Sequence, residues 1–252
     1  MTDPLFDVSG LVVLVAGGAG GLGKVLAQSL AERGAKVTVA DLADGAATEV
    51  AKNLPGKGHS SSALDVRDEV SCRVAVSQAT EAVGRLDVLL NCVGIFQTAP
   101  ALELTAKDFE DSILTNLAGA FFLARAAGKV MVNQSAGRII TLASVSSKVV
   151  NPDYAAYASS KAGLSHLTRV LALEWAKHKV TVNAIGPAVV PTPLAEDFLK
   201  KSGKYDYQMS RIPLGRFCAA EDLLGVTLLL ASQAGAFITG QTIYVDGGRT
   251  LL

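Results

Sequence analysis

Short apolar segments alternate with longer amphipathic segments along almost the whole chain. Most of the short segments are continuous runs rich in Val, Ile and Leu, which is the pattern of strands that are buried on both faces. The sequence predicts about seven strands of this kind, at residues 11–16, 36–40, 58–64, 86–90, 138–142, 180–185 and 242–245.

The segments between these strands have the apolar spacing of helices. Predicted helices occupy a segment that ends near residue 53 and residues 21–33, 68–83, 105–123, 124–133, 154–177 and 219–231. Strands that alternate with helices form a parallel sheet covered on both sides, because the crossover connections are right-handed. The sequence therefore predicts the α/β class, with a doubly wound parallel sheet of the Rossmann type in a single domain over residues 1–252.

The longest irregular stretch, residues 186–214, follows the carboxyl end of the sixth predicted strand. Ligands of doubly wound sheets bind outside the carboxyl ends of the strands, and long irregular loops at such places are usually functional. We therefore expect residues 186–214 to form a lid over the substrate.

Composition narrows the range of partners. Lys and Arg together number 23, as do Asp and Glu, so the formal net charge is zero and nucleic acid is not an expected partner. Without a signal peptide or an apolar stretch of 18 residues, the chain is expected in the cytoplasm, away from membranes. Three cysteines and three histidines without ligand spacing predict free thiols and no metal site.

A glycine-rich turn joins the first predicted strand to the first predicted helix. Glycines allow the backbone to approach a pyrophosphate, and the start of a helix offers free N–H groups and the positive end of its dipole. A glycine cluster alone could be an ordinary turn, but its place between a strand and a helix is that of a dinucleotide-binding fingerprint. The turn residues expected at the cofactor are Gly17, Gly20, Gly21, Leu22 and Gly23.

Asp41 ends the second predicted strand, about 20 residues beyond that turn. A carboxylate there can bind the adenosine ribose hydroxyls and would repel the 2′-phosphate of NADP. No Lys or Arg lies in the glycine turn or directly beside Asp41 to offset the charge. We therefore expect NAD as the cofactor, the alternative being that Asp41 is a solvated turn residue.

Tyr157 and Lys161 lie four residues apart in a predicted helix and so share one face of it. A nearby ammonium favours the phenolate and lowers the pKa of a tyrosine, which can then act as a general acid or base. Ser144 follows the fifth predicted strand, where its hydroxyl could stabilise a developing negative charge on a substrate oxygen. Each has an ordinary alternative, a surface Tyr–Lys pair and an N-cap serine.

These motifs, taken in order along the chain, resemble the short-chain dehydrogenase/reductase superfamily. The glycine motif Thr-Gly-x-x-x-Gly-x-Gly of that family is matched at Gly17, Gly21 and Gly23, with Ala16 in place of the Thr. The resemblance covers essentially the whole chain. It implies a catalytic set made up of Asn116, Ser144, Tyr157 and Lys161, in which Asn116 and Lys161 would connect the tyrosine to solvent through water.

Further family elements imply the remaining cofactor contacts. The Asn-Asn-Ala-Gly element resembles residues 91–94, and the Pro-Gly-x-x-x-Thr element resembles residues 187–192 with Ala188 in place of the Gly. The adenine-contacting Asp of the family corresponds to Asp65. The cofactor contacts expected beyond the glycine turn are Asp41, Leu42, Asp65, Val66, Asn91, Cys92, Val93, Gly94, Tyr157, Lys161, Pro187, Ala188, Val190, Thr192 and Leu194.

The resemblance implies an NAD-dependent oxidoreductase that interconverts a secondary alcohol and a ketone. The residues 245–248, Val-Asp-Gly-Gly, resemble an element used in tetramer contacts, so a homotetramer is expected. Two alternatives remain open: a 3-oxoacyl carrier-protein reductase, and a catalytically silent dinucleotide-binding sensor.

The sequence says least about the substrate. A neutral secondary alcohol, either a polyol, a sugar-derived or a cyclic alcohol, is favoured over a carboxylate, because the expected lid is mostly apolar and its lysines are expected to face water. The residues expected to border the substrate are Gln97, Val145, Ser146, Tyr154 and Val189.

Overall fold

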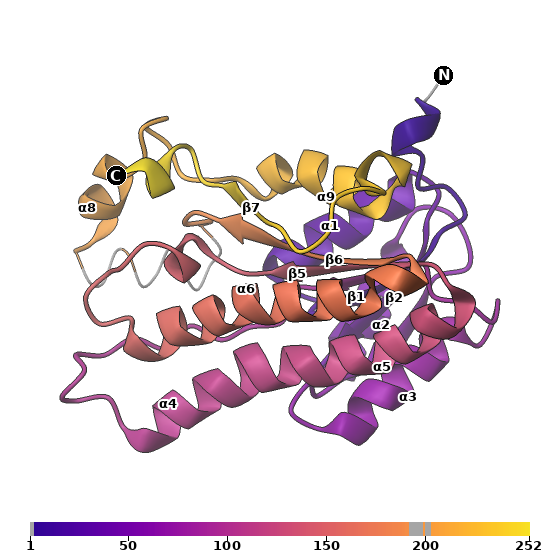
Figure 1. Ribbon diagram of the computed structural model, residues 1–252, viewed down its shortest axis with the longest axis horizontal. Helices are drawn as coiled ribbons and strands as arrows, with labels where there is room; N and C mark the ends of the chain where they lie inside the picture. The colour runs from indigo at the N-terminus through magenta and orange to yellow at the C-terminus, as the bar shows by residue number, and fades with distance from the viewer. Residues whose placement is uncertain (1–2, 192–198, 200–202) are drawn as a thin grey trace.

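The fold is built on one parallel sheet of seven strands in the order β3-β2-β1-β4-β5-β6-β7 (Figure 1). The computed structural model describes residues 3–191, 199 and 203–252. The strands are β1 (Val12–Ala16), β2 (Lys36–Asp41), β3 (Ser60–Ala63), β4 (Val88–Asn91), β5 (Gly137–Leu142), β6 (Val180–Pro187) and β7 (Thr242–Val245). The predicted α/β class, the Rossmann-type topology and the strand number are confirmed.

Helices cover both faces of this sheet (Figure 1). The helices of four residues or more that Figure 1 labels are α1 (Gly21–Glu32), α2 (Asp44–Asn53), α3 (Glu69–Thr80), α4 (Ala106–Ile113), α5 (Gly119–Gln134), α6 (Ala155–Trp175), α8 (Tyr205–Ser210) and α9 (Leu224–Ala231). Residues of α1, α2 and α9 pack in one apolar core, whereas residues of α3, α5 and α6 pack in the other.

Alternation along β1 shows how the chain supplies both cores at once. Val13 and Val15 face the core beneath α1, while Val12 and Leu14 face the core beneath α3 and α5. All five residues of β1 are buried, which is why this strand is a continuous apolar run. Because every strand pair in the sheet is parallel, the carboxyl ends of the seven strands lie along one edge.

One helical connection differs from the sequence-based expectation. A break between residues 123 and 124 was expected, but helix continues from α4 through η2 (Leu114–Ala118) into α5 without one. The segment η2 is a turn of π-helix, a local widening that occurs mostly at functional sites. The continuous helix buries a side chain of η2, Asn116, beneath the carboxyl end of the sheet.

The predicted lid is only partly visible in the described structure. Residues 186 and 187 still belong to β6, and α8 lies near the C-terminus of the chain (Figure 1). Residues 192–198 and 200–202 lie outside the described residues. Among the described helices, none is long and apolar enough to cross a membrane.

Candidate active site

The glycine turn brings the start of α1 against the end of β1. A Cβ atom on Gly23 would lie 2.1 Å from the carbonyl oxygen of Gly17, so only glycine permits this approach. Gly17 itself has a φ of +71° and lies against the backbone of Cys92. On the open side a Cβ on Gly20 would meet nothing within 4 Å, and no side chain caps the start of α1. The free N–H groups and the open approach fit a dinucleotide pyrophosphate.

Asp41 lies beside this turn, at the end of β2. Its Oδ2 accepts a hydrogen bond of 3.0 Å from the backbone N–H of Ala19, which ties the second strand to the turn. Among the described residues, its Oδ1 accepts no hydrogen bond. Leu42, the next residue, is 67% exposed and contributes no charge. A ribose hydroxyl placed at the turn would therefore meet a carboxylate oxygen.

Asp65 and Val66 follow β3, one of the two edge strands of the sheet. The Asp65 carboxylate pairs with the Arg67 guanidinium, with Nη2–Oδ2 at 2.7 Å and Nε–Oδ1 at 2.9 Å. These hydrogen bonds lower the pKa of Asp65. Val66 is buried against Gly119 at the start of α5. The acid expected to contact adenine is therefore already held by a neighbouring arginine.

The segment after β4 connects the glycine turn to the residues expected to be catalytic. Asn91 is buried, and its Oδ1 accepts a hydrogen bond from the backbone N–H of Val93. Three residues after Asn91, a Cβ atom on Gly94 would lie 3.2 Å from Lys161 Nζ and 3.3 Å from Asn116 Oδ1. The absence of a side chain at Gly94 thus leaves room for both polar groups.

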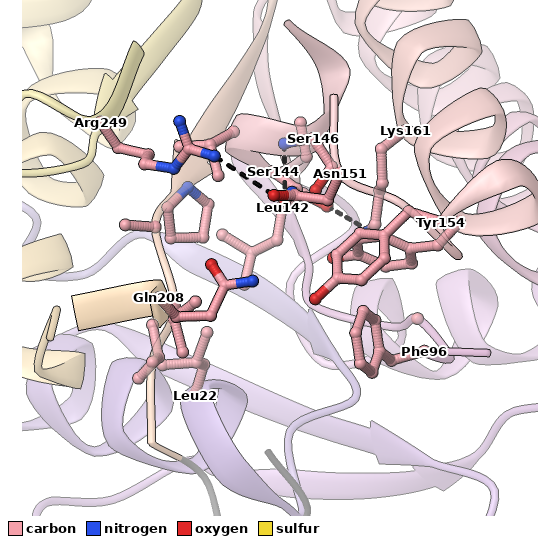
Figure 2. Close-up of a pocket in the computed structure, with 18 of the residues that line it drawn as sticks. Leu22, Phe96, Leu142, Ser144, Ser146, Asn151, Tyr154, Lys161, Gln208 and Arg249 are labelled. Carbon is pink, nitrogen blue, oxygen red and sulfur yellow. Dashed lines mark hydrogen bonds between the residues drawn. The ribbon is translucent and has the colours of Figure 1, made fainter. Parts of the chain in front are cut away.

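A cavity of about 270 Å³ opens at the carboxyl ends of β4, β5 and β6 (Figure 2). Expected residues from distant parts of the chain, between Leu22 and Val190, meet in its wall. They are Leu22, Cys92, Gly94, Ser144, Val145, Ser146, Tyr154, Tyr157, Lys161, Pro187, Ala188, Val189 and Val190.

Ser144 and Tyr157 meet in this cavity from different elements. Ser144 lies two residues after the end of β5. It also caps η3 (Val145–Ser147), because its Oγ accepts a hydrogen bond of 3.1 Å from the N–H of Ser146. Tyr157 lies in the first turn of α6. A hydrogen bond with Ser144 lowers the pKa of Tyr157, but burial raises it by more, so its pKa lies above the ordinary value. That direction is opposite to the one expected from the Tyr–Lys pair.

Lys161 explains part of this difference. Its Nζ donates a hydrogen bond of 2.8 Å to the carbonyl oxygen of Leu142 and lies 5.8 Å from the centre of the Tyr157 ring. Burial lowers the pKa of Lys161 to about 8. The amino group of Lys161 is therefore held on the backbone of β5 and is partly uncharged in mildly alkaline solution. Both facts limit its effect on the pKa of the Tyr157 phenol.

Asn116, in the π-helical turn η2, forms hydrogen bonds with two segments of the site. Its Nδ2 donates to the carbonyl oxygen of Ile95 and to Ser160 Oγ, both at 3.0 Å, and its Oδ1 accepts from the N–H of Ile95 at 2.8 Å. Ser160 Oγ donates in turn to the carbonyl oxygen of Tyr157. Asn116 thus links the segment after β4 to the helix that holds the tyrosine.

Not every expected residue reaches the cavity. Gln97 lies outside its wall, because its side chain accepts a hydrogen bond from Ser112 Oγ at 2.9 Å and donates one to Asp108 at 3.4 Å. The sequence does not predict that two side chains of α4 form hydrogen bonds with this amide. Thr192 and Leu194 lie outside the described residues. No cluster of His, Cys, Asp or Glu able to hold a metal occurs in the part of the chain that the structure describes.

The cavity also contains residues that the sequence did not single out. Phe96 packs edge-to-face against Tyr157 and Tyr154, with ring centres 4.9 Å and 5.2 Å apart. Gln208 of α8 and Arg249, three residues from the end of the chain, lie in the opposite wall (Figure 2). Phe96 follows the Asn91–Gly94 element closely enough to have been noticed. Arg249 and Gln208 are brought there by tertiary structure alone.

Comparison with known proteins places this geometry in a family. A family model described as "Enoyl-(Acyl carrier protein) reductase" matches residues 17–250. D-threitol dehydrogenase of Mycolicibacterium smegmatis is 35% identical, over 98% of this chain and 95% of its own. Gluconate 5-dehydrogenase of Gluconobacter oxydans is 32% identical, over 100% and 99%.

A solved structure agrees with these relatives. The crystal structure of a gluconate 5-dehydrogenase from Burkholderia cenocepacia in complex with NADP and tartrate has a TM-score of 0.94 and 31% identity, over 99% of this chain and 98% of its own. The chain therefore belongs to the short-chain dehydrogenase/reductase superfamily. It is an oxidoreductase of the kind that acts on secondary alcohols with a nicotinamide dinucleotide.

Proposed function

We propose that this protein is an NAD-dependent dehydrogenase that oxidises a secondary hydroxyl of a polyol or sugar-derived substrate, with Tyr157 as acid/base. The observation that carries the proposal is the meeting of Ser144, Tyr157 and Lys161 in one cavity beside the glycine turn. The polyol and sugar-acid dehydrogenases among the relatives support the substrate class.

Tyr157 and Ser144 act on the same oxygen of the substrate in different ways. In the oxidation direction, Tyr157 Oη takes the proton of the alcohol while the C–H hydrogen leaves as hydride, so the C–O bond becomes a carbonyl. Ser144 Oγ donates a hydrogen bond to the same oxygen and stabilises its developing negative charge. Phe96 packs against the tyrosine ring and helps to hold it in place.

The residues that would hold the cofactor are the glycine turn, Asp41 and the segments after β4 and β6. A bound oxidised nicotinamide supplies the hydride acceptor for the reaction. Lys161 would bind the ribose next to the nicotinamide and, with Asn116, connect Tyr157 to solvent. Asp41 is the basis for proposing NAD, although the structure from Burkholderia cenocepacia is described as a complex with NADP.

The raised pKa of Tyr157 favours its role as a proton donor in ketone reduction over its role as a proton acceptor in alcohol oxidation. At neutral pH the phenol is protonated, which makes it a ready proton donor to a ketone. In the oxidation direction the phenolate is required, so oxidation depends on the small deprotonated fraction and benefits from alkaline solution.

Replacing Tyr157 by Phe tests the proposal. The substitution keeps the ring that packs on Phe96 but removes the phenol oxygen that takes the proton, so kcat is expected to fall by a factor of about 10² to 10⁴. Turnover is followed by the absorbance of reduced nicotinamide, with a panel of polyols and sugar acids offered to the wild type. NAD binding, measured by calorimetry, is expected to change little.

Three results would contradict the proposal. They are retained turnover in Tyr157→Phe, efficient reduction of a 3-oxoacyl thioester with NADPH in preference to any polyol, and dinucleotide binding without turnover of any alcohol. The second and third would favour the carrier-protein reductase and the silent sensor, respectively.

We also propose that the protein works as a homotetramer. Apolar side chains are exposed along the outer helices on one side of the sheet, among them Phe109, Leu114, Val170 and Leu173, the last at 82%. An apolar surface of this kind is a usual site of subunit contact. The segment 245–248 ends in a tight turn that could take part as well.

A further inference from the structure

Arg249 is a charged side chain buried in the wall of the candidate active site. Only 3% of the residue is exposed, although arginine is rarely buried without an ionic partner. It begins the short 3-10 helix η7 (Arg249–Leu251), and Figure 2 shows its side chain at the edge of the cavity, directed toward Asn151. Its burial requires an explanation.

The backbone around Arg249 fixes its position. Gly247 and Gly248 have φ values of +58° and +90°, and the carbonyl oxygen of Gly247 accepts a hydrogen bond from Leu214. Asp246 accepts hydrogen bonds from the N–H groups of Gly248 and Thr250, one on each carboxylate oxygen. This turn places the arginine in the cavity wall without the help of an ion pair.

The guanidinium uses little of its hydrogen-bonding capacity. Nη2 donates one hydrogen bond of 3.2 Å to Asn151 Oδ1, and Nη1 is buried with no partner among the described residues. A guanidinium carries five N–H donors arranged in a planar fork. A buried cation with unpaired donors is costly unless an anion approaches it.

The charges nearby do not supply that anion. Burial and the neighbouring Arg211 both lower the pKa of Arg249, and the raising effects of Tyr207 and Asp246 are smaller. The Asp246 carboxylate is engaged by two backbone N–H groups. Asp153, the acid next to Tyr154, forms an ion pair with Lys204 at 2.7 Å. Around Arg249 the cavity wall therefore has an excess of positive charge.

Gln208 adds a second unused polar group to the same wall. It is 4% exposed, lines the cavity, and its side-chain amide has no hydrogen-bond partner within the described part of the chain. Figure 2 shows this amide in the space below Arg249. The surrounding side chains, such as Ile212 and Val189, are apolar. The Nη1 group of Arg249 and the Gln208 amide, set beside these apolar side chains, therefore define a polar corner of the cavity.

We propose that Arg249 binds a carboxylate of the substrate, with Gln208 as a hydrogen-bond donor, so that the protein oxidises a polyhydroxy acid rather than a neutral polyol. This inference rests on the proposed function, because the hydroxyl being oxidised is the one that Tyr157 and Ser144 meet across the same cavity. A guanidinium fork matches a carboxylate in shape and charge. The carboxylate takes no part in the redox step and only orients the chain of the substrate.

The preference for a neutral alcohol, drawn from the lid sequence, is thus reversed by a residue outside the lid. A carboxylate also fits the cavity wall better than a phosphate ester. Arg211 lies outside the wall, and the polar neighbours of Arg249 within it, Asn151 and Gln208, are neutral amides. The wall therefore matches a single negative charge more closely than the one to two charges that a phosphate ester carries at neutral pH.

The test compares D-gluconate with D-glucitol, which has the same carbon chain but no carboxylate, and with a sugar phosphate. The wild type is expected to favour the acid. In Arg249→Met, the ratio of kcat/KM for gluconate to kcat/KM for glucitol is expected to fall about 100-fold or more. Arg249→Lys keeps the charge without the fork and is expected to lie between the two.

Arg73→Met is the matched control, because the side chain of Arg73 is 60% exposed on α3, away from the cavity. It is expected to leave the substrate ratio unchanged. A wild type that favours glucitol or the phosphate, or an Arg249→Met variant with an unchanged ratio, would overturn the inference. Should Arg249→Met not fold, the wild-type preference and Arg249→Lys still decide the question.

A binding measurement separates this inference from the proposed function. Gluconate or tartrate is expected to raise the thermal midpoint of the wild type and of Tyr157→Phe, but not that of Arg249→Met. If the acid binds through Arg249 yet no alcohol is ever oxidised, the proposed function fails and the anion site stands. If alcohols are oxidised but acids neither bind nor react, only the anion site fails.

Discussion

At the scale of a single residue, we expect Asp41 to combine two roles. Its Oδ2 braces the glycine turn through the N–H of Ala19, and its charge faces the place expected for the adenosine ribose. The first role needs only an oxygen that accepts a hydrogen bond, whereas discrimination against NADP needs a negative charge. The two can therefore be separated by substitution.

Asp41→Asn keeps the acceptor for Ala19 but removes the charge, and Asp41→Ala removes both. Loss of the repulsion is expected to shift the ratio of kcat/KM for NAD to that for NADP toward NADP by about 10- to 100-fold, equivalent to about 1.4–2.8 kcal/mol. Both variants should show this shift. Asp41→Ala should in addition raise the KM for both cofactors because the turn is loosened. An unchanged preference in both variants would rule out Asp41 as the source of cofactor choice.

At the scale of elements, α1 and β1 meet through glycine backbone rather than side chains. The contact of Gly23 with the Gly17 carbonyl brings the start of the helix to the edge of the sheet, where its N–H groups are free. Gly94 likewise leaves room for Lys161 and Asn116 because it has no side chain. In both places the site depends on the absence of a side chain.

Gly23→Ala is expected to destabilise the protein by about 1–3 kcal/mol and to weaken dinucleotide binding, because the new Cβ would press on backbone that cannot give way. Urea unfolding and calorimetric titration with NAD measure the two effects. Gly225→Ala in α9 is the control, since a Cβ there meets nothing within 4 Å. That substitution is expected to stabilise the helix by about 0.5–1 kcal/mol. Equal behaviour of the two variants would show that the Gly17–Gly23 contact is unimportant.

At the scale of the whole molecule, burial of ionisable groups sets the response to alkaline pH. Burial raises the pKa of the Cys72 thiol to about 12 and that of Cys218 to about 11. Tyr154 behaves in the same way, with a pKa of about 12. Each stays protonated in the native state while it ionises in the unfolded chain. The stability that these groups contribute is complete below pH 9 and is lost as the pH rises toward their native pKa values.

The urea midpoint of the wild type is therefore expected to fall between pH 9 and pH 10.5 under reducing conditions. Cys72→Ala should lose less stability over this interval, because one group that contributes up to about 1.4 kcal/mol per pH unit has been removed. Ser77→Ala, on the exposed side of the same helix α3, has no titrating group and should follow the wild type. A parallel decline in all three would contradict the raised pKa of Cys72.

Much of the architecture and part of the site could be predicted from the sequence. Strands buried on both faces must be continuous apolar runs, so β1 and β4 are visible in the sequence, as is the glycine turn that only glycine can form. The motifs around Asp41, Ser144, Tyr157 and Lys161 sit at strand ends or in a helix start, which local pattern locates well. The break expected at residue 123 was wrong, since α5 runs without interruption from Gly119 to Gln134. The π-helical turn that joins α4 to α5, at Leu114–Ala118, also has no signal in the sequence.

Tertiary structure alone decided the electrostatics and the substrate end of the cavity. The pKa of Tyr157 depends on burial, which outweighs the Ser144 hydrogen bond, and the ammonium of Lys161 is held by a backbone carbonyl of β5. Gln97 is drawn away by side chains of α4. Arg249 enters the cavity from the far end of the chain because the turn at 246–248 packs against the segment after α8. Local sequence specifies the elements and the chemistry at their ends, but contacts between distant segments determine which charges face the substrate.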